Sequence, residues 1–412
     1  MTSTAVPATP CVLYVNHTGH FGGGEHSLVT LIEAMGDRVR SFVCCPRGEL
    51  EKTLGALQIP VLPITPTDGS LALHPVRTPA ALIAHGVAAR QIAGWARALD
   101  ADLIHANSIR AGLSAGLASR LGGPRVVAHI RDRLPDGTPS RTAFILLGRS
   151  CDWTIANSAF TAEGARDPRL RSRLSVIHNA VDTDRFDPTR VEPAGVRQEL
   201  DGGGAGPVLG VLAQITPWKA QDDAIAITSL LRERYPQVRL VLAGSPKFVS
   251  RSTRFDNTRF MHQLRRSVST LGLDENVLFL GERADIPQIL GAIDFLLVPS
   301  TEEPFGRAMI EGMAMQVPVL ATAVGGPAEV ITYGDDGMLL PPRSPERWAN
   351  EIATLFEAPD LARRMGERAR QTVLERFTAA RHSEQVLDVY RRVLTTQRSF
   401  RREQQMAGAS GL

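Results

Sequence analysis

Two glutamates eight positions apart are the strongest chemical signal in this 412-residue sequence. Glu303 follows the apolar run Phe295–Val298, and Glu311 lies in the helix-forming stretch that comes next. If most of the interval is helical, the rise separates the two residues by roughly 10 Å, which approximates the distance from the sugar to the ribose of a nucleotide sugar. Each carboxylate can accept hydrogen bonds from two neighbouring hydroxyls. The alternative is a helix cap and a solvated helix face, but the apolar neighbours of Glu311 favour a carboxylate with a partner.

A lysine follows another apolar run in the second half of the chain, and we expect it at the same edge of the predicted sheet as Glu303. The sequence holds 46 basic residues, and only Lys52, Lys219 and Lys247 are lysines. Lys219 follows the first apolar run of the second half, and its compact ammonium could hold a diphosphate there. The alternative is a surface lysine at a helix start, where the helix dipole mildly disfavours a cation.

A glycine-rich turn follows the first apolar run, Val12–Val15. Gly22, Gly23 and Gly24 stand between that run and a helix-like segment, where backbone amides can approach a phosphate. The spacing is not G-x-G-x-x-G, and no acidic residue ends the second apolar run, so a dinucleotide site is disfavoured. A plain tight turn is the alternative.

Two further segments carry polar groups of less certain use. His129 to Arg133 follows an apolar run, and its imidazole could serve an acceptor hydroxyl, although composition alone favours a satisfied histidine in a polar loop. The arginine cluster of residues 166–173 is typical of a solvated face, and it could instead meet an anionic membrane or an acceptor.

The sequence predicts no metal site. Asp182 and Asp184 form an Asp-x-Asp pattern, which binds a metal–diphosphate in some transferases, but here a turn or a helix cap is favoured. His-x-Glu-x-x-His and Cys-x-x-Cys patterns are absent from the sequence, so we expect neither a metal nor another cofactor.

Short apolar runs alternate with helix-like segments and predict an α/β protein with two doubly wound parallel sheets. In the first half the predicted strands are Val12–Val15, Ser41–Cys45, Val61–Ile64, Leu103–His105, Val126–Ile130, Trp153–Ala156 and Ser175–Ile177. In the second half they are Val208–Ala213, Leu240–Ala243, Val277–Leu280, Phe295–Val298, Val317–Ala321 and Met338–Leu340. Residues 179–206, rich in Asp, Pro and Gly, indicate a linker. We expect the ligand in the cleft between the two domains.

Composition excludes several classes of protein. A net charge of +3 is close to balanced and argues against a nucleic-acid binder. The longest apolar runs are far too short to span a bilayer, and the first ten residues carry no basic residue, so no secretory signal is expected. Four cysteines give neither a disulfide framework nor a metal spacing. We therefore expect a cytoplasmic enzyme.

Together these motifs resemble those of the retaining GT-B glycosyltransferases of family 4, the glycosyl transferases group 1 set. The resemblance runs from Val12 to about Val393. Its most specific part is the Glu-x7-Glu motif in EPFGRAMIE, which continues with GMAMQVPVLATAVGGPAEVI. The glycine-rich turn and the segment VIHNAVDTDRF support it.

The resemblance implies a donor site in the second half of the chain. Glu303 would bind the hydroxyls of the donor sugar, with the amides of Phe305 and Gly306 close to the same sugar. Glu311 would hold the ribose. Lys219 would neutralise the diphosphate leaving group.

The resemblance also implies contacts elsewhere. Gly23 and Gly24 would contact the phosphates, and His129 would lie beside the transferred sugar and the acceptor. Arg283, after Val277–Leu280, would help to hold the base, mostly through its backbone. Sugar transfer would retain the anomeric configuration without a protein nucleophile or a metal.

One position departs from the family pattern. The family usually has an arginine five positions before the lysine, where this sequence has Gln214. A neutral amide removes one positive charge from the diphosphate site. Either Lys219, helix dipoles and an arginine from elsewhere suffice, or the leaving group is held differently.

The resemblance implies a first, acceptor-side domain over residues 10–190, a nucleotide-sugar domain over 207–378, and a helix over 379–400 that returns to the first domain. The expected partners are a nucleotide-sugar donor and an acceptor hydroxyl on a natural product, an envelope glycan or a lipid, with no nucleic acid. A peripheral membrane contact and the oligomeric state stay open. A nucleotide-sugar epimerase of the same fold and a non-catalytic partner subunit or solute binder are the alternatives.

Overall fold

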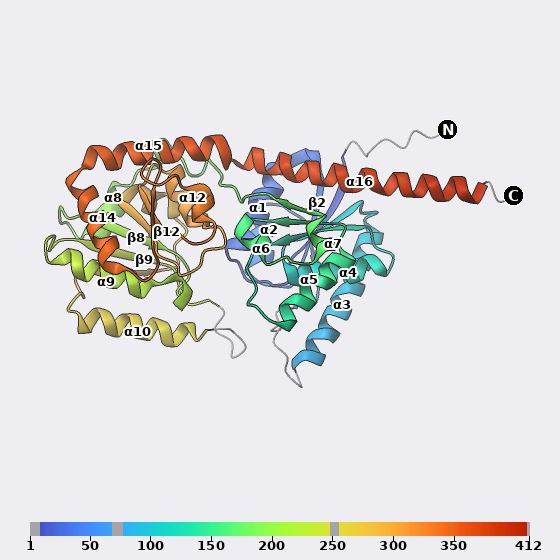
Figure 1. The fold of residues 1–412 in the computed structure, drawn as a ribbon, viewed down its shortest axis with the longest axis horizontal. Coiled ribbons are helices and arrows are strands. Elements are labelled where there is room, and N and C mark those ends of the chain that lie inside the picture. Colours follow the sequence, from blue (N-terminus) through green and yellow to red (C-terminus); the bar gives the residue numbers. More distant parts are fainter. Residues whose placement is uncertain (1–8, 68–76, 248–254, 410–412) are drawn as a thin grey trace. The chain divides into compact units, whose positions relative to one another are not determined.

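The computed structural model describes residues 9–67, 77–247 and 255–409, and these form two compact units (Figure 1). Unit 1 contains the described residues up to Asn179 and those from Ala379 onward. Unit 2 runs from Ala180 to Thr378.

Unit 1 is built on a parallel sheet of seven strands in the order β3-β2-β1-β4-β5-β6-β7. The strands are β1 (Cys11–Val15), β2 (Arg40–Cys45), β3 (Val61–Pro63), β4 (Leu103–Ala106), β5 (Arg125–Ile130), β6 (Trp153–Ala156) and β7 (Leu174–Val176). The central strands β1 and β4 are buried along their whole length, as expected of apolar runs in a sheet covered on both faces. Each predicted strand of the first half is confirmed to within a residue or two.

Helices cover both faces of the unit 1 sheet. One apolar core lies under α3 (Arg77–Ala98), α4 (Ile109–Arg120) and α5 (Thr138–Ser150). The other lies under α1 (Gly23–Met35), α2 (Glu49–Ala56) and α16 (Ala379–Ala409). The short elements are η1 (Gly36–Arg38), α6 (Ala159–Glu163) and α7 (Pro168–Arg171). Because α16 buries Val386, Val389, Tyr390 and Val393 in the second core, the predicted C-terminal helix does pack on the first domain.

Unit 2 is built on a parallel sheet of six strands in the order β10-β9-β8-β11-β12-β13. The strands are β8 (Val208–Leu212), β9 (Arg239–Ala243), β10 (Val277–Gly281), β11 (Phe295–Val298), β12 (Val319–Thr322) and β13 (Met338–Leu340). Here too the predicted strands are confirmed, so the fold is the expected pair of doubly wound α/β units.

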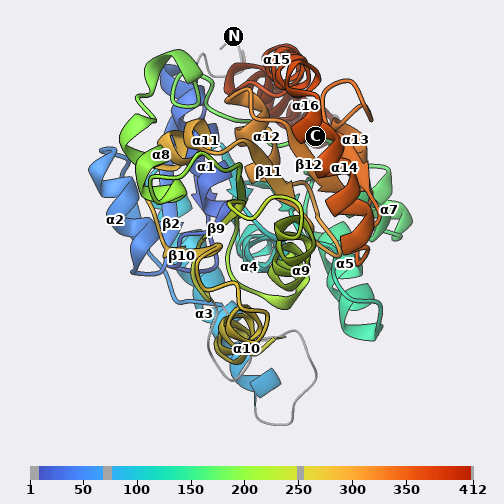
Figure 2. The ribbon, with the colours of Figure 1, turned by 90° about the vertical axis from the view of Figure 1, so that its left-hand side faces the viewer.

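The helices of unit 2 also divide between the two faces of its sheet. Figure 2 shows α8 (Ala194–Asp201), α11 (Ile286–Ala292) and α12 (Arg307–Ala314) on one side and α9 (Gln221–Arg232) and α10 (Asn257–Thr270) on the other. The core of the second face also contains α14 (Pro345–Glu357), and α15 (Pro359–Arg376) contributes residues to the cores of both faces. The short elements are η2 (Pro188–Arg190), η3 (Pro217–Lys219) and α13 (Pro327–Val330).

The predicted linker over residues 179–206 is wrong. This segment holds η2 and α8, and Val181, Phe186 and Leu200 are buried in a core of unit 2. The Asp, Pro and Gly residues that suggested a linker form turns and caps around these apolar anchors. Residues 180–190, which we placed in the first domain, therefore lie in unit 2.

In both sheets the strand order reverses at the centre. Unit 1 reverses between β1 and β4, and unit 2 reverses between β8 and β11. The loops that leave neighbouring strands in opposite directions open a crevice at the carboxyl edge of such a sheet, which is where doubly wound folds bind ligands. Each unit therefore has one position at which its fold predicts a site.

Among the described residues, no helix is long and apolar enough to cross a membrane.

Candidate functional site

Lys219 and Glu303 meet at the point where the strand order of unit 2 reverses. Lys219 ends η3 after β8, and Glu303 lies in the loop after β11. The Lys219 ammonium Nζ lies 2.5 Å from Glu303 Oε2. It also lies 4.1 Å from the ring centroid of Trp218. Only 16% of the lysine side chain and 5% of the glutamate side chain are exposed, so the pair is shielded from water.

Backbone contacts hold the two loops against each other. The Thr301 amide donates to the Trp218 carbonyl at 2.9 Å, which joins the Glu303 loop to the Lys219 loop. On the other side, the Ile215 amide donates to the Ser245 carbonyl at 3.0 Å. Gly244 allows this approach, because its φ is +143° and a Cβ atom there would lie 2.0 Å from the Ala213 oxygen.

The Glu303 carboxylate and backbone are fixed by their own neighbours. The Ser300 hydroxyl donates to Glu303 Oε2 at 2.9 Å, and the Gly326 amide donates to the Glu303 carbonyl at 2.8 Å. Gly306 ends the loop with φ +93° and begins α12 without a side-chain cap. Phe305 is buried beside Phe377. The predicted site residues Glu303, Phe305 and Gly306 therefore form one rigid turn.

Glu311 lies on α12, as predicted, and its partner is Arg307. Arg307 Nη2 donates to Glu311 Oε1 at 2.6 Å, and both side chains are mostly buried, with 16% and 13% exposed. The sequence analysis missed Arg307, although a cation four residues before a carboxylate on a helix was a readable signal. The buried carboxylate does have a partner, and that partner comes from its own helix.

Gln214 stands half-buried in the loop after β8, where its backbone carbonyl accepts a hydrogen bond from the side-chain Nε2 of Gln221 at 2.9 Å. The arginine beside this loop is Arg343, whose guanidinium binds Asp222 at 2.6 Å and Asp223 at 2.9 Å. Its other nitrogen reaches the Pro217 carbonyl at 3.4 Å. Arg343 thus ties η3 to the start of α9, and its charge is already balanced by two carboxylates.

Arg283 is held between two carboxylates. Its guanidinium makes paired contacts with Asp285, at 2.7 and 2.6 Å, and with Glu199, at 2.7 and 3.2 Å. Hydrogen bonds to Asp285 and Glu199 raise the pKa of Arg283, so the charge is permanent. This side chain fastens α8 to the loop after β10, and its predicted contact with a base stays a prediction.

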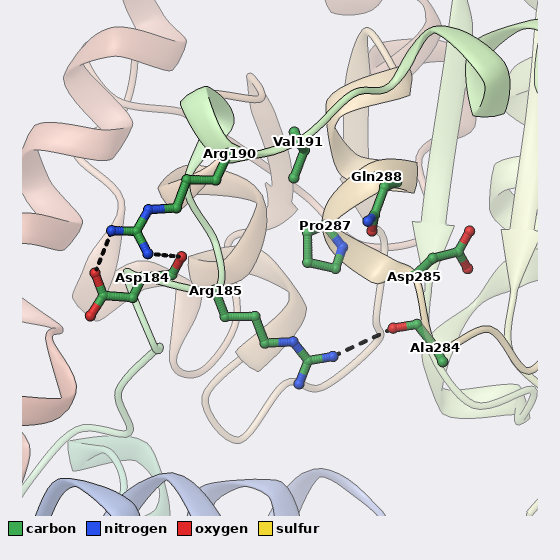
Figure 3. Close-up of a pocket in the computed structure, with 8 residues that line it drawn as sticks. All are labelled: Asp184, Arg185, Arg190, Val191, Ala284, Asp285, Pro287 and Gln288. Atoms are coloured by element: carbon green, nitrogen blue, oxygen red, sulfur yellow. Dashed lines mark hydrogen bonds and ion pairs between the residues drawn. The ribbon is translucent and has the colours of Figure 1, made fainter.

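A surface hollow of about 500 Å³ opens beside the Arg283 clamp (Figure 3). Arg185, Arg190, Asp184 and Asp285 line it, and Figure 3 shows Arg190 directed at Asp184 and Arg185 directed at the Ala284 carbonyl. These contacts balance its charges internally. The Asp-x-Asp pattern is a turn, as favoured, because Asp182 Oδ1 accepts the amides of Asp184 and Arg185.

In unit 1 the glycine-rich turn lies over a buried arginine. Gly22 caps α1, and its amide donates to Glu25 at 3.0 Å. A Cβ atom on Gly24 would lie 3.5 Å from the Arg131 side chain, while one on Gly23 would meet nothing within 4 Å. Arg131 Nη2 donates to Asn107 Oδ1 at 2.7 Å, and burial lowers the pKa of Arg131 to about 10. The predicted contact of Gly23 and Gly24 with phosphates stays a prediction.

The structure buries His129 completely. It lies within β5, its ring stacks 4.7 Å from that of His105, and neither ring nitrogen has a hydrogen-bond partner among the described residues. Burial, and then the charge of Arg131, lower the pKa of His129 well below its usual value. Because a strand position next to a covering helix has no exposed surface, the expected contact of this ring with an acceptor is not what the structure shows.

Sequence models of two families match almost adjoining parts of the chain. Glycosyltransferase Family 4 matches residues 21–185, and Glycosyl transferases group 1 matches residues 197–372. The putative glycosyltransferase EpsD of Bacillus subtilis is 30% identical over 56% of this chain and 57% of its own length. A D-inositol 3-phosphate glycosyltransferase of Stackebrandtia nassauensis is 29% identical over 64% and 62%. The chain thus spans less than two thirds of either curated relative.

Among solved structures, an Anabaena protein, Alr3699/HepE, is similar over nearly its whole length. Its crystal structure in complex with UDP-glucose has a TM-score of 0.79 and 27% identity, and the match covers 92% of this chain and 99% of that one. The likeness extends over both units. The chain belongs to the GT-B glycosyltransferases of family 4, the glycosyl transferases group 1 set.

Proposed function

We propose that this protein transfers a sugar from a nucleotide-diphosphate sugar to an acceptor hydroxyl, with retention of the anomeric configuration and without a metal. The observation that carries the proposal is the Lys219–Glu303 pair at the reversal point of the unit 2 sheet. It joins a cation and a hydroxyl-binding carboxylate in a shielded place, at the edge where this fold binds ligands.

On binding, the donor would replace the contact between Lys219 and Glu303 with contacts of its own to each residue. Its diphosphate would take the Lys219 ammonium, and the sugar hydroxyls would donate to the Glu303 carboxylate. Since the Ser300 hydroxyl and backbone bonds already hold Glu303, little reorganisation is needed on binding. Glu311 would take the ribose hydroxyls on the next helix, where Arg307 already donates to its carboxylate.

Leaving-group stabilisation would supply most of the catalysis. Charge develops on the diphosphate as the bond to the sugar breaks, and a fixed ammonium in a water-poor site stabilises that charge more than water does. We assign Glu303 to binding rather than to attack on the sugar, because Lys219 and Ser300 both hold its Oε2. Retention would then follow from attack by the acceptor on the face that the diphosphate leaves.

The identity of the donor is proposed from the relatives. The Anabaena protein was crystallised in complex with UDP-glucose, which makes a UDP-hexose the first donor to test. The missing arginine at Gln214 suggests that the diphosphate relies on Lys219 more than in other members of the family. The acceptor and the linkage are left to experiment.

The test is nucleotide release from a panel of UDP-, GDP- and dTDP-sugars with candidate acceptors, followed by NMR of the product anomer. We expect release from one donor class, no loss of activity with chelator, and loss in Lys219→Ala and Glu303→Gln. Lys52→Ala is the matched control, because Lys52 is exposed on α2. An epimerised free sugar without acceptor, or donor binding without release, would replace the proposal by one of its alternatives.

A further inference from the structure

A cluster of basic side chains lies where the strand order of unit 1 reverses. His17 is the second residue after β1, and Ser108 is the second after β4. The two strands are neighbours, with Val15 opposite Ala106. As a result the two loops start side by side, and the Ser108 hydroxyl lies 3.0 Å from His17 Nδ1. This is the crevice position of the unit 1 sheet.

Helices α3 and α4 add two more groups to the cluster. His85 on α3 approaches Ser114 on α4, with Nδ1 and Oγ 2.7 Å apart. Arg110 precedes Ser114 by one turn and therefore shares its face of α4. The Nε atom of Arg110 is buried and has no hydrogen-bond partner among the residues that the structure describes. Since buried donors normally have partners, this nitrogen needs an explanation.

The charges that shift the histidine pKa values in this cluster are all positive. Burial first, and then the charges of Arg110, His85 and His20, together lower the pKa of His17 to about 3. Burial and Arg110 also lower the pKa of His85. No carboxylate is among the causes of either shift. Arg110 in addition stands in the first turn of α4, where the helix dipole disfavours a cation.

We propose that Arg110, His17 and His85 form a binding site for a phosphate or carboxylate group, and that this anion is part of the acceptor. The fork of a guanidinium suits either anion, and the imidazoles and the Ser108 hydroxyl can complete its hydrogen bonds. The part of the proposal that concerns the acceptor rests on the proposed function. The part that concerns anion binding does not.

Two kinds of ligand could carry such an anion. It can belong to a water-soluble phosphomonoester or to a lipid headgroup. Leu82 and Ile83 stand within one turn before His85 on α3, and each is 67% exposed. An acyl chain could cover these two side chains, whereas a soluble ligand would leave them in water. The two sources can therefore be separated by substitution at Leu82 and Ile83.

The first experiment titrates inorganic phosphate into the full chain without nucleotide sugar and follows the histidine ring signals by NMR. Phosphate should move the signals of His17 and His85 and raise their pKa values, because an anion favours the charged imidazole. Arg110→Gln should weaken this response by about tenfold or more. Arg90→Gln, an exposed position on α3, is the matched control. Lys219→Ala should leave the response intact, which separates it from phosphate bound in unit 2.

The second experiment compares glycerol 3-phosphate with vesicles of phosphatidylglycerol and of phosphatidylcholine. Binding of glycerol 3-phosphate that Arg110→Gln weakens supports a soluble ligand. Binding of anionic vesicles alone, weakened by Arg110→Gln and by Leu82→Ser with Ile83→Ser, supports a headgroup. An absent histidine response, or binding unchanged in Arg110→Gln, would overturn the anion site. A chain that binds phosphate here but transfers no sugar would refute the proposed function and leave the anion site standing.

Discussion

The Lys219 ammonium and the Glu303 carboxylate lie 2.5 Å apart across the point where the strand order of the unit 2 sheet reverses. The two residues belong to loops after different strands, so only the fold brings them together. Because the pair is largely withdrawn from water, removing one partner leaves the other charge poorly compensated. This relationship makes the pair testable by stability as well as by activity.

We predict that the two residues are strongly coupled in stability. Lys219→Gln and Glu303→Gln should each lower the unfolding free energy of unit 2 by about 2 kcal/mol, because each leaves a shielded charge unpaired. The loss of unfolding free energy in the double variant should be smaller than the sum of the two single losses, by at least about 1 kcal/mol. Thermal denaturation of all four proteins measures this. Strictly additive losses would show that the contact contributes nothing.

Gly326→Ala should disturb the Glu303 loop. A Cβ atom at Gly326 would lie 2.3 Å from Phe305 Cα, so the backbone must move, at a cost of about 2 kcal/mol. The matched control is Gly94→Ala in the interior of α3, where a Cβ atom would meet nothing within 4 Å. This control should stabilise by about 0.5 kcal/mol, since alanine favours a helix. Equal melting temperatures for the two variants would contradict the packing described here.

Acid should weaken unit 1 through His382. His382 Nδ1 donates to the His178 carbonyl, 2.7 Å away, and burial lowers the pKa of His382 to about 4 from an unfolded value of 6.5. The unfolded chain therefore binds the extra proton between these pH values, and stability present above pH 6.5 falls as the pH drops towards 4. The loss from His382 is about 3 kcal/mol when complete.

His382→Asn should flatten this dependence, because an amide can still donate to the His178 carbonyl but does not titrate. The exposed His262→Asn should leave it unchanged. Urea unfolding at several pH values makes the comparison. The same slope in His382→Asn and in the unsubstituted protein would assign the acid sensitivity elsewhere.

His129→Leu should keep sugar transfer within about threefold of normal, because the ring is buried and both its nitrogens lack a hydrogen-bond partner among the described residues. Leucine fills a similar volume and leaves no polar atom buried. Steady-state kinetics on the folded variant measure the effect. A fall in kcat of about 100-fold with a normal melting temperature would restore a catalytic role to this residue.

The sequence was sufficient to predict the strands and the loops that carry Lys219 and Glu303, because buried parallel strands are continuous apolar runs between helical segments. It failed at residues 179–206, where turn-forming residues surround Val181, Phe186 and Leu200 and conceal a folded segment. Turn-forming residues indicate where the chain changes direction, and they do not indicate that the segment around them is unpacked.

Side-chain contacts between residues far apart in the chain could not be predicted from the sequence either. The clamp of Arg283 by Glu199 joins residues 84 positions apart, and the burial of His129 depends on α16, which supplies Tyr390 beside His105. No local pattern reveals such partners. By contrast, the Arg307–Glu311 contact of the candidate site had a local spacing that could have been read in advance.

The most direct test of the account is the dissociation constant of UDP-glucose, measured by calorimetry on the unsubstituted protein, Lys219→Ala and Lys52→Ala. If Lys219 holds the diphosphate, its removal should weaken binding about 10- to 100-fold, the value of a charged hydrogen bond in a shielded site. Lys52→Ala should bind as the unsubstituted protein does. Equal dissociation constants for all three proteins would contradict the assignment of the Lys219–Glu303 pair as the donor site.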